Sequence, residues 1–315
     1  MEKRQLGATS LQSTPIVFGG NIFGWTVDRK KSFELLDAFT DKGFNAIDTA
    51  DVYSRWVPGN KGGESETIIG EWMNQKDNRD QVLLFTKGGA DAGHGPDLSA
   101  KNIIESVEHS LRRLQTDHID LYFSHFDDGK TPVDETLEAY SRLVAAGKLL
   151  FIGTSNMSRE RIVASLESSD QSSYPRYQVL QPLYNLYDRE KFETEYLDLV
   201  TEQGMGVTAY YSLASGFLTG KYRTEQDLNK SPRGAGIKKY LDAKGHRILE
   251  ALDKVSEAHR ATPAQVAIAW LIRQPAITAA IASATSKNQV EDFSKAVELK
   301  INEEEMKMLT ASGKK

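Results

Sequence analysis

Residues 101–125 read "KNIIESVEHSLRRLQTDHIDLYFSH", which predicts a helix followed directly by a strand. In the first part, apolar residues recur every three or four positions, which places them on one helix face: Ile103, Ile104, Val107, Leu111 and Leu114. The second part, 119–125, is a short run that is apolar on both faces and follows a polar turn. Such runs are typical of strands in a buried parallel sheet. The stretch therefore predicts one unit of an α/β fold.

The same pattern recurs along the whole chain. Short apolar runs that resemble 119–125 occupy seven other ranges: 15–20, 44–48, 82–87, 149–156, 177–182, 206–210 and 277–283. Helix-like segments lie between them, for example 134–148, where Gly147 is a helix C-terminal signal. Eight strands that alternate with helices predict a (β/α)8 TIM barrel, and a doubly wound sheet is the alternative.

The ends of the chain favour the barrel over the open sheet. Residues 3–13 contain a glycine turn between two short runs, which predicts a β-hairpin that closes the barrel floor. No linker or low-complexity segment divides the 315 residues, so we expect a single domain over 1–315. The longest irregular stretch, 212–243, follows the seventh strand. A loop of this length in a barrel is expected to act as a lid or cofactor clamp.

Composition excludes several classes of function. Hydrophobic content of 39% and charged content of 26% are typical of a globular protein with a large core. A net charge of −5, with acids and bases interspersed, argues against a nucleic-acid partner. The chain has no cysteine, its six histidines are scattered, and it has no H-E-x-x-H motif, so we expect no metal site. The polar N-terminus and the absence of long apolar runs indicate a cytoplasmic protein with no membrane partner.

Ionisable residues follow three neighbouring predicted strands at their carboxyl ends, where barrel enzymes build their sites. The second strand ends in Asp48, the third in Lys87 and the fourth in His125, and Tyr53 lies just after the second. Each has an ordinary structural interpretation, such as a helix cap or a surface side chain. Their joint placement at one rim predicts the catalytic group.

These residue types suit proton donation to a carbonyl oxygen. A phenol is a weak acid, and a neighbouring ammonium is expected to lower the pKa of Tyr53. Lys87 is the candidate for that ammonium, and Asp48 is expected to keep it protonated. A neutral His125 opposite could donate a hydrogen bond that orients the carbonyl. The predicted chemistry is proton transfer to an oxygen while a hydride reaches the adjacent carbon.

A hydride requires a cofactor, since no side chain supplies one. The chain has no G-x-G-x-x-G fingerprint, and "GFLTGK" (216–221) has the wrong spacing for a P-loop. Polar and aromatic residues at the later strand ends could instead clamp a carboxamide and stack on a flat ring: Ser155, Asn156, Gln181 and Tyr210.

The sequence resembles the aldo-keto reductase family over nearly its whole length. The motifs that carry the resemblance are "NAIDTADVYS", "LLFTKGG", "HIDLYFSHFDD", "GKLLFIGTSN", "LQPLYN", "VTAYYSLASGFLTGKY" and "TPAQVAIAWLI". The resemblance implies a (β/α)8 barrel that binds NADP(H) without a Rossmann fold, and a catalytic tetrad of Asp48, Tyr53, Lys87 and His125 with Tyr53 as proton donor.

The resemblance also assigns the cofactor contacts. Ser155, Asn156 and Gln181 would hold the nicotinamide carboxamide, Tyr210 would stack on its ring, and Leu213, Gly216 and Lys221 would line the pyrophosphate. The remaining candidate cofactor residues lie after the first and eighth strands: Gly20, Asn21, Ser283, Ser286, Lys287 and Gln289.

Two departures from the family pattern bear on the cofactor. Many members have an arginine for the 2′-phosphate where Gln289 stands, and an asparagine where Phe293 stands. Ser286 and Lys287 remain as phosphate partners, so NADPH is expected and NADH is the alternative. In addition, "YYSL" replaces the more common "YSPL", so Tyr211 and Ser212 stand where the loop usually holds a proline.

The expected function is NAD(P)H-dependent reduction of an aldehyde or ketone, or the reverse oxidation. Trp25, Trp56 and Phe126 are the predicted walls of the substrate pocket. Two alternatives stay open: a cofactor-sensing ancillary channel subunit, as some relatives of this family are, and a nucleotide-free lyase or isomerase that uses Lys87 and Tyr53.

Overall fold

The protein, described here from a computed structural model, contains a closed barrel of eight parallel strands. The strands are β3 (Ile16–Gly19), β4 (Ala46–Asp48), β5 (Leu83–Gly88), β6 (Ile119–Ser124), β7 (Leu149–Ser155), β8 (Tyr177–Gln181), β9 (Gly206–Ala209) and β10 (Ala279–Ala282), with β10 pairing back onto β3. The structure describes residues 1–91, 93–231 and 233–314; Ala92, Pro232 and Lys315 lie outside the description, although the predicted domain includes them. The predicted (β/α)8 TIM barrel is confirmed.

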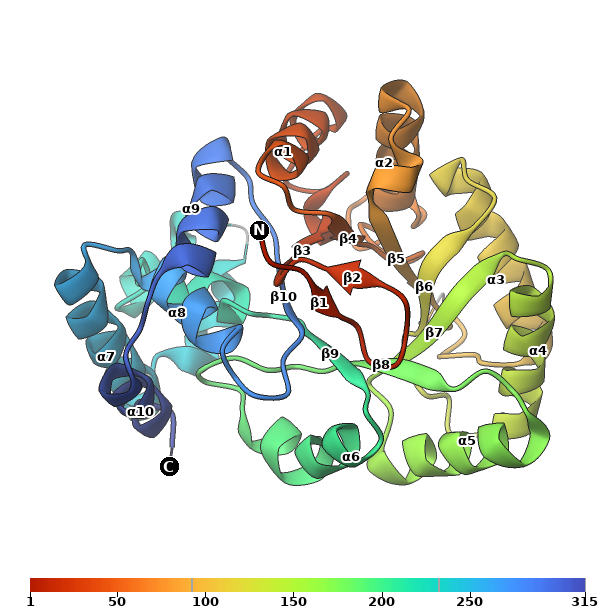
Figure 1. The fold of residues 1–315 in the computed structure, drawn as a ribbon. Helices are drawn as coiled ribbons and strands as arrows, with labels where there is room; N and C mark the ends of the chain where they lie inside the picture. Colours follow the sequence, from red (N-terminus) through yellow and green to blue (C-terminus); the bar gives the residue numbers. More distant parts are fainter. Residues whose placement is uncertain (92, 232, 315) are drawn as a thin grey trace.

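Helices surround the barrel as an outer ring (Figure 1). They are α1 (Arg29–Asp41), α2 (Glu64–Lys76), α3 (Ala100–Leu114), α4 (Val133–Ala145), α5 (Arg159–Ser172), α6 (Leu197–Glu202), α7 (Ala243–His259), α8 (Pro263–Leu271), α9 (Lys287–Glu298) and α10 (Glu303–Ser312). A π-helical turn (Phe192–Tyr196) precedes α6, and single 3-10 turns lie at Gly20–Ile22 and Arg79–Gln81. Helix α3 begins after the Ser99 cap, whose hydroxyl accepts from the Asn102 backbone N–H.

The two-residue period of the strands separates an inner core from an outer core. One buried cluster contains alternate strand residues, such as Phe85 on β5, Phe123 on β6 and Val179 on β8. Their neighbours in the strands, such as Leu84 and Tyr122, belong to the other cluster, with residues of the surrounding helices. Because side chains alternate along a strand, Lys87 lies on the same face of β5 as Phe85, two residues closer to its carboxyl end. The apolar interior therefore forms a base beneath the polar residues of the barrel mouth.

The N-terminal hairpin closes the opposite end. Strands β1 (Arg4–Gln5) and β2 (Gln12–Ser13) pair antiparallel, and Figure 1 shows them in front of the barrel strands. Leu6 and Leu11 are buried in the inner core, so the hairpin contributes apolar side chains to the barrel floor. Its glycine is required: Gly7 has φ +59, and a Cβ there would lie 2.4 Å from the carbonyl oxygen of Gln178.

The stretch 212–243 differs from the irregular loop that the sequence predicts. Its described residues contain three 3-10 segments: η4 (Ala214–Thr219), which is kinked at Ser215 and Gly216, η5 (Glu225–Lys230) and η6 (Gly234–Tyr240). A capping box between Thr224 and Asp227 begins η5. Phe217 and Tyr240 are buried, with ring centroids 5.3 Å apart. Short helical turns of this kind lack the 3.6-residue pattern of a longer helix, so the sequence did not reveal them.

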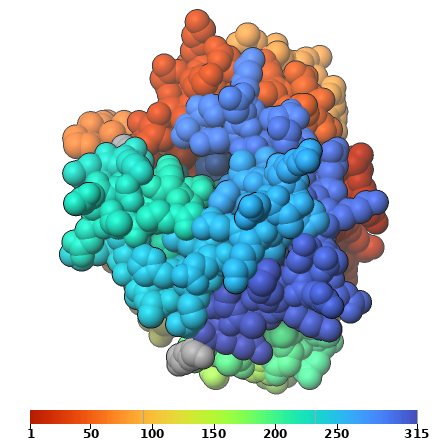
Figure 2. All heavy atoms as spheres, turned by 90° about the vertical axis from the view of Figure 1, so that its left-hand side faces the viewer, coloured from red at the N-terminus to blue at the C-terminus, as the bar shows by residue number. Residues whose placement is uncertain are grey.

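Figure 2 shows where this stretch lies on the surface. Its teal and cyan atoms form one side of the view, while the red atoms of the N-terminal hairpin lie at the opposite edge. The stretch therefore flanks the mouth of the barrel and is separate from the floor. Among the described residues, no helix combines the length and the apolar character needed to cross a membrane.

Candidate functional site

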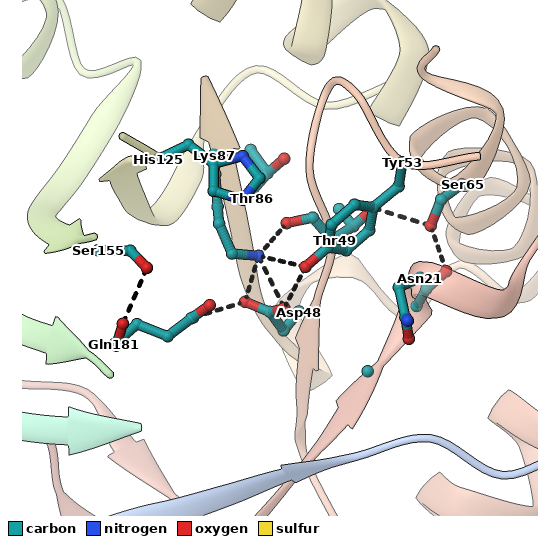
Figure 3. Close-up of polar contacts among 12 residues, drawn as sticks. Asn21, Asp48, Thr49, Tyr53, Ser65, Thr86, Lys87, His125, Ser155 and Gln181 are labelled. Atoms are coloured by element: carbon teal, nitrogen blue, oxygen red, sulfur yellow. Dashed lines mark hydrogen bonds and ion pairs between the residues drawn. The ribbon is translucent and has the colours of Figure 1, made fainter. Parts of the chain in front are cut away.

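Asp48, Tyr53 and Lys87 meet at the carboxyl ends of β4 and β5. The Lys87 Nζ lies 2.8 and 2.7 Å from the two carboxylate oxygens of Asp48 and 3.1 Å from the hydroxyl of Tyr53. The ammonium also donates to the carbonyl oxygen of Thr49, at 2.6 Å. Figure 3 shows Lys87 at the centre of these contacts. The expected Asp–Lys–Tyr constellation is thus present as a connected set of hydrogen bonds.

The ion pair between Lys87 and Asp48 is buried, with side-chain exposures of 1% and 2%. Burial lowers the pKa of Lys87, because the charged form loses its hydration, and Asp48 opposes that shift. Asp48 in turn accepts a further hydrogen bond at 2.9 Å from the side-chain amide of Gln181. These contacts fix the position of the ammonium below the Tyr53 phenol.

The electrostatics of Tyr53 differ from the sequence-based expectation. Its pKa is raised well above the ordinary value, first by burial and then by the charge of Asp48, rather than lowered by Lys87. The Asp48 carboxylate lies 3.5 Å from the phenol oxygen, so its negative charge opposes phenolate formation. Tyr53 is therefore a protonated phenol at neutral pH, which is the form that can donate a proton.

His125 follows β6 directly and faces Tyr53, with ring centroids 6.2 Å apart. Burial lowers the pKa of this imidazole well below its ordinary value, and the Lys87 charge lowers it further. The ring is therefore neutral at neutral pH, as the sequence predicts. Its Nδ1 is buried and makes no hydrogen bond within the described part of the chain.

A polar network connects the later strand ends to this group. The Ser155 hydroxyl donates to the carbonyl of Gln181 at 2.8 Å, and the Asn156 side-chain amide donates to Ser155 and to the carbonyl of His125, each at 3.0 Å. The Tyr210 hydroxyl donates to the Asn156 Oδ1 at 2.9 Å. Hydrogen bonds thus connect four of the predicted cofactor residues to the predicted catalytic group, and Figure 3 shows Ser155 and Gln181 beside it.

Gly20, Asn21 and Ser283 form a second junction, between β3 and β10. The Ser283 hydroxyl contacts both the carbonyl of Gly19 and the side-chain oxygen of Asn21 at 2.7 Å. Gly20 is closely packed: a Cβ there would lie 2.9 Å from the Ser65 hydroxyl and 3.1 Å from the carbonyl of Asp48. This glycine therefore allows the first strand end to approach the second.

The other predicted cofactor residues form two separate groups. Leu213, Gly216 and Lys221 lie on or beside η4, where Gly216 has φ +102. Ser286 caps α9 by accepting from the Gln289 backbone N–H, Lys287 begins that helix, and the Gln289 side chain accepts from Thr285 N–H at 2.7 Å. In the described part of the chain, no hydrogen bond or ion pair joins the residues of η4 to those of α9.

Aromatic residues surround Tyr53. Trp56 lies 6.3 Å from Tyr53 and 5.5 Å from Trp25, centroid to centroid, and Phe126 lies 4.8 Å from His125. Trp56 and Phe126 are 51% and 39% exposed. The structure therefore brings together all three residues that the sequence assigns to the substrate walls.

Two charged residues near the site had no signal in the sequence. The guanidinium of Arg233 lies over the Trp25 ring at 5.3 Å, and its Nη2 is buried without a hydrogen-bond partner in the described part of the protein. Asp51 lies in the turn after β4, and its backbone N–H donates to the carbonyl of Lys87 at 3.1 Å. Only the folded chain shows these contacts, because they depend on residues that are distant in the sequence.

The raised pKa of Asp51 predicts that the stability of the protein depends on pH. Burial, and then the charge of Glu66, raise the pKa of Asp51 to about 7 from 3.8. The folded protein thus binds a proton that the unfolded chain releases, so this carboxyl lowers the free energy of unfolding as the pH rises from about 4 to 7. Asp51→Asn removes this penalty. The stabilisation that the substitution gives at pH 8 should therefore exceed the one at pH 4.5 by about 2–4 kcal/mol. Urea unfolding at both pH values measures this difference, and an equal effect at both would contradict the assignment.

In the described ranges, no cluster of three or more His, Asp or Glu side chains could hold a metal ion. The polar network at Ser155, Asn156 and Gln181, together with the Tyr210 ring, fits a flat ring with an amide substituent.

Known proteins resemble this chain over most of its length. The model of the aldo/keto reductase family matches residues 15–314. An uncharacterized oxidoreductase, YrpG, of Bacillus subtilis is 35% identical over 98% of this chain and 95% of its own length. The aldo-keto reductase YhdN of the same organism is 33% identical, over 98% and 92%. A probable voltage-gated potassium channel subunit beta of Arabidopsis thaliana is 30% identical, over 95% and 92%.

The family match covers the strand ends that carry Asp48, Lys87 and His125, the polar network and the stretch 212–243 alike. The barrel and the resemblance noted from the sequence motifs agree with it. The chain belongs to the aldo/keto reductase family and is an oxidoreductase of that family.

Proposed function

We propose that this protein catalyses the NAD(P)H-dependent reduction of an aldehyde or ketone, or the reverse reaction, with Tyr53 as the proton donor. The observation that carries the proposal is the buried contact of Lys87 with both Asp48 and the Tyr53 hydroxyl. It supplies a neutral phenol next to a fixed ammonium at the mouth of the barrel. In this environment the phenolate that remains after proton donation is stabilised by the ammonium 3.1 Å away.

Each residue of the site has a defined role in the proposed reaction. A bound nicotinamide supplies the hydride. Tyr53 protonates the carbonyl oxygen, and the neutral His125 donates a hydrogen bond that orients it. Asp48 keeps Lys87 charged despite its burial. Ser155, Asn156 and Gln181 would hold the cofactor amide, and Tyr210 would stack on its ring.

The phosphates of the cofactor would be bound on both sides of the barrel mouth. The backbone at Gly216, with Lys221, provides one group, and the N-terminus of α9, with Ser286 and Lys287, provides the other. A helix N-terminus favours a phosphate through its free N–H groups. Lys287 is the cation in the first turn of α9, and the neutral side chain of Gln289 accepts from Thr285, so we propose NADPH as the cofactor and NADH as the alternative.

A second function follows from one of the comparisons. A relative of similar length is named a probable potassium channel subunit beta, which favours an ancillary role in which the nucleotide is bound but turnover is slight. Both functions need the cofactor site. They differ in whether carbonyl compounds are turned over at an appreciable rate.

One experiment tests both functions. NADPH or NADH is added to the pure protein while the intrinsic fluorescence is followed, and an aromatic aldehyde is then added while the absorbance of the reduced nicotinamide is recorded. We expect quenching, followed by loss of absorbance. No binding of either nucleotide would refute both functions, whereas binding without turnover of any of a broad set of carbonyl compounds would favour the ancillary role.

A further inference from the structure

The strand that carries Lys87 has a buried polar layer on its outer face. Side chains alternate along a strand, so Thr86 and Gly88 face away from the barrel interior, opposite to the Lys87 side chain. The Thr86 hydroxyl donates to Glu66 on α2 at 2.6 Å, and Glu66 also accepts from the Arg113 guanidinium on α3 at 2.6 Å. Thr86 and Glu66 are fully buried. The proposed roles of the site residues leave this layer unexplained.

Asp51 joins this layer from the turn after β4. Its backbone N–H donates to the carbonyl of Lys87 at 3.1 Å, so the turn is bonded directly to the residue that carries the ammonium. Its carboxyl lies beside the next residue of the strand. A Cβ on Gly88 would lie 3.3 Å from the Asp51 Oδ2 and 2.0 Å from the Tyr122 hydroxyl. Both polar groups therefore pack against the backbone of Gly88, where a side chain would displace them.

Asp51 lacks a partner that would compensate a negative charge. Its Oδ1 is buried and makes no hydrogen bond within the described part of the chain, and the same holds for the Tyr122 hydroxyl. The Arg113 guanidinium already pairs with Glu66, and among the described residues no ion pair includes Asp51. A second carboxylate without a cation would be costly in this layer, because burial disfavours the charged form. The contacts therefore favour the neutral acid at Asp51.

The groups that face Asp51 come from all the elements packed around it. Burial, and then the charge of Glu66 on α2, raise the pKa of Asp51 to about 7, while Arg113 on α3 and Lys87 on β5 lower it. Two phenols also face this layer and stay neutral, because burial raises the pKa of each well above its ordinary value: Tyr122 on β6 and Tyr140 on α4. Ionisation of Asp51 thus adds a negative charge behind β5 as the pH rises through neutrality.

We propose that Asp51 is a positioning residue that acts through Lys87: as a neutral acid it supports the end of β5, and its ionisation slows the reduction. This inference rests on the proposed reductase function and adds the regulation of that site by pH. Proton donation by Tyr53 creates a phenolate, which the Lys87 ammonium stabilises. An anion on the other face of the same strand attracts that ammonium and repels the phenolate through a low-dielectric interior. The phenolate therefore forms less readily when Asp51 is charged.

The test compares Asp51→Asn with the unaltered protein at pH 6 and pH 8. Each protein is loaded with NADPH and mixed with an aromatic aldehyde, and a single turnover is followed by the absorbance of the reduced nicotinamide. The two rates should be similar at pH 6, whereas at pH 8 the unaltered protein should be about two- to fivefold slower than the variant. The ratio of the two rates cancels every pH effect that both proteins share. Asp120→Asn is the control: it removes a buried acid that pairs with Arg79, and its ratio should not change with pH.

Glu66→Gln provides a second measurement, which also serves if Asp51→Asn does not fold. It removes the charge that raises the pKa of Asp51, so the slowing should begin at a lower pH than in the unaltered protein. Turnover with a ratio for Asp51→Asn that is the same at both pH values would show a purely structural role and overturn the inference. An unchanged pH profile of Glu66→Gln would overturn it as well. Absence of turnover by the unaltered protein at both pH values would refute the proposed function itself, and this inference with it.

Discussion

Replacing Tyr53 with phenylalanine should lower the rate of carbonyl reduction by about 10²–10⁴-fold while cofactor binding changes little. The substitution removes only the hydroxyl that lies 3.1 Å from Lys87 and 3.5 Å from Asp48. A positioned proton donor contributes about that factor to a rate. The ring remains to pack against Trp56, so the aromatic surroundings of the site are retained. Steady-state kinetics with an aldehyde and a fluorescence titration with NADPH measure the two effects.

A matched control for this prediction is Tyr184→Phe. Tyr184 is buried and donates to Glu193 at 2.8 Å, so the substitution also removes one hydrogen-bonded phenol, away from the catalytic group. It should leave the rate of reduction near that of the unaltered protein. Full activity of Tyr53→Phe would show that the proton comes from another group.

The second large effect is expected on stability, from Asp48→Asn. The substitution removes the anion next to a buried ammonium, and breaking such a pair costs about 3–5 kcal/mol of the free energy of unfolding. Lys87 can respond by losing its proton, because burial already lowers its pKa. The unfolded chain then binds one more proton than the folded variant at neutral pH, so the stability of the variant rises with pH. The deficit relative to the unaltered protein should thus be largest near pH 6 and smaller near pH 9.

Asp120→Asn is the control for this pH dependence. Asp120 is also buried, and it pairs with Arg79 at 2.8 Å. An arginine does not lose its proton in this pH range, so the deficit of Asp120→Asn should be the same at pH 6 and pH 9. Urea unfolding of both variants at the two pH values decides the matter. A deficit of Asp48→Asn that does not change with pH would show that Lys87 stays charged without its partner.

Much of the site could be predicted from the sequence because strand order and strand ends are local properties. Once eight short apolar runs are assigned to a barrel, the residue at the carboxyl end of each run has a defined place. Lys87 lies near the carboxyl end of β5 and His125 follows β6 directly, and the structure places them beside Asp48 and Tyr53. The same reasoning placed Gln181 at the end of β8, where its amide reaches Asp48.

The prediction for Tyr53 was correct in position but wrong in the direction of its pKa. From the sequence, the charge of Lys87 is expected to have the largest effect on the pKa of Tyr53. The folded chain adds burial, which disfavours any charged phenolate, and it brings Asp48 to 3.5 Å from the phenol oxygen. Distance and burial are properties of the tertiary structure, so no residue pattern could supply them.

The sequence by itself determined the barrel, the hairpin at its floor and the identity of the residues at its mouth. The reason is that the spacing of apolar residues and the strand ends depend on residues that are close together in the chain. Only the tertiary structure decided the charge states of the site, the 3-10 segments of 212–243 and the buried carboxyl of Asp51. These depend on contacts between distant segments and on the removal of water, which arise when the chain folds.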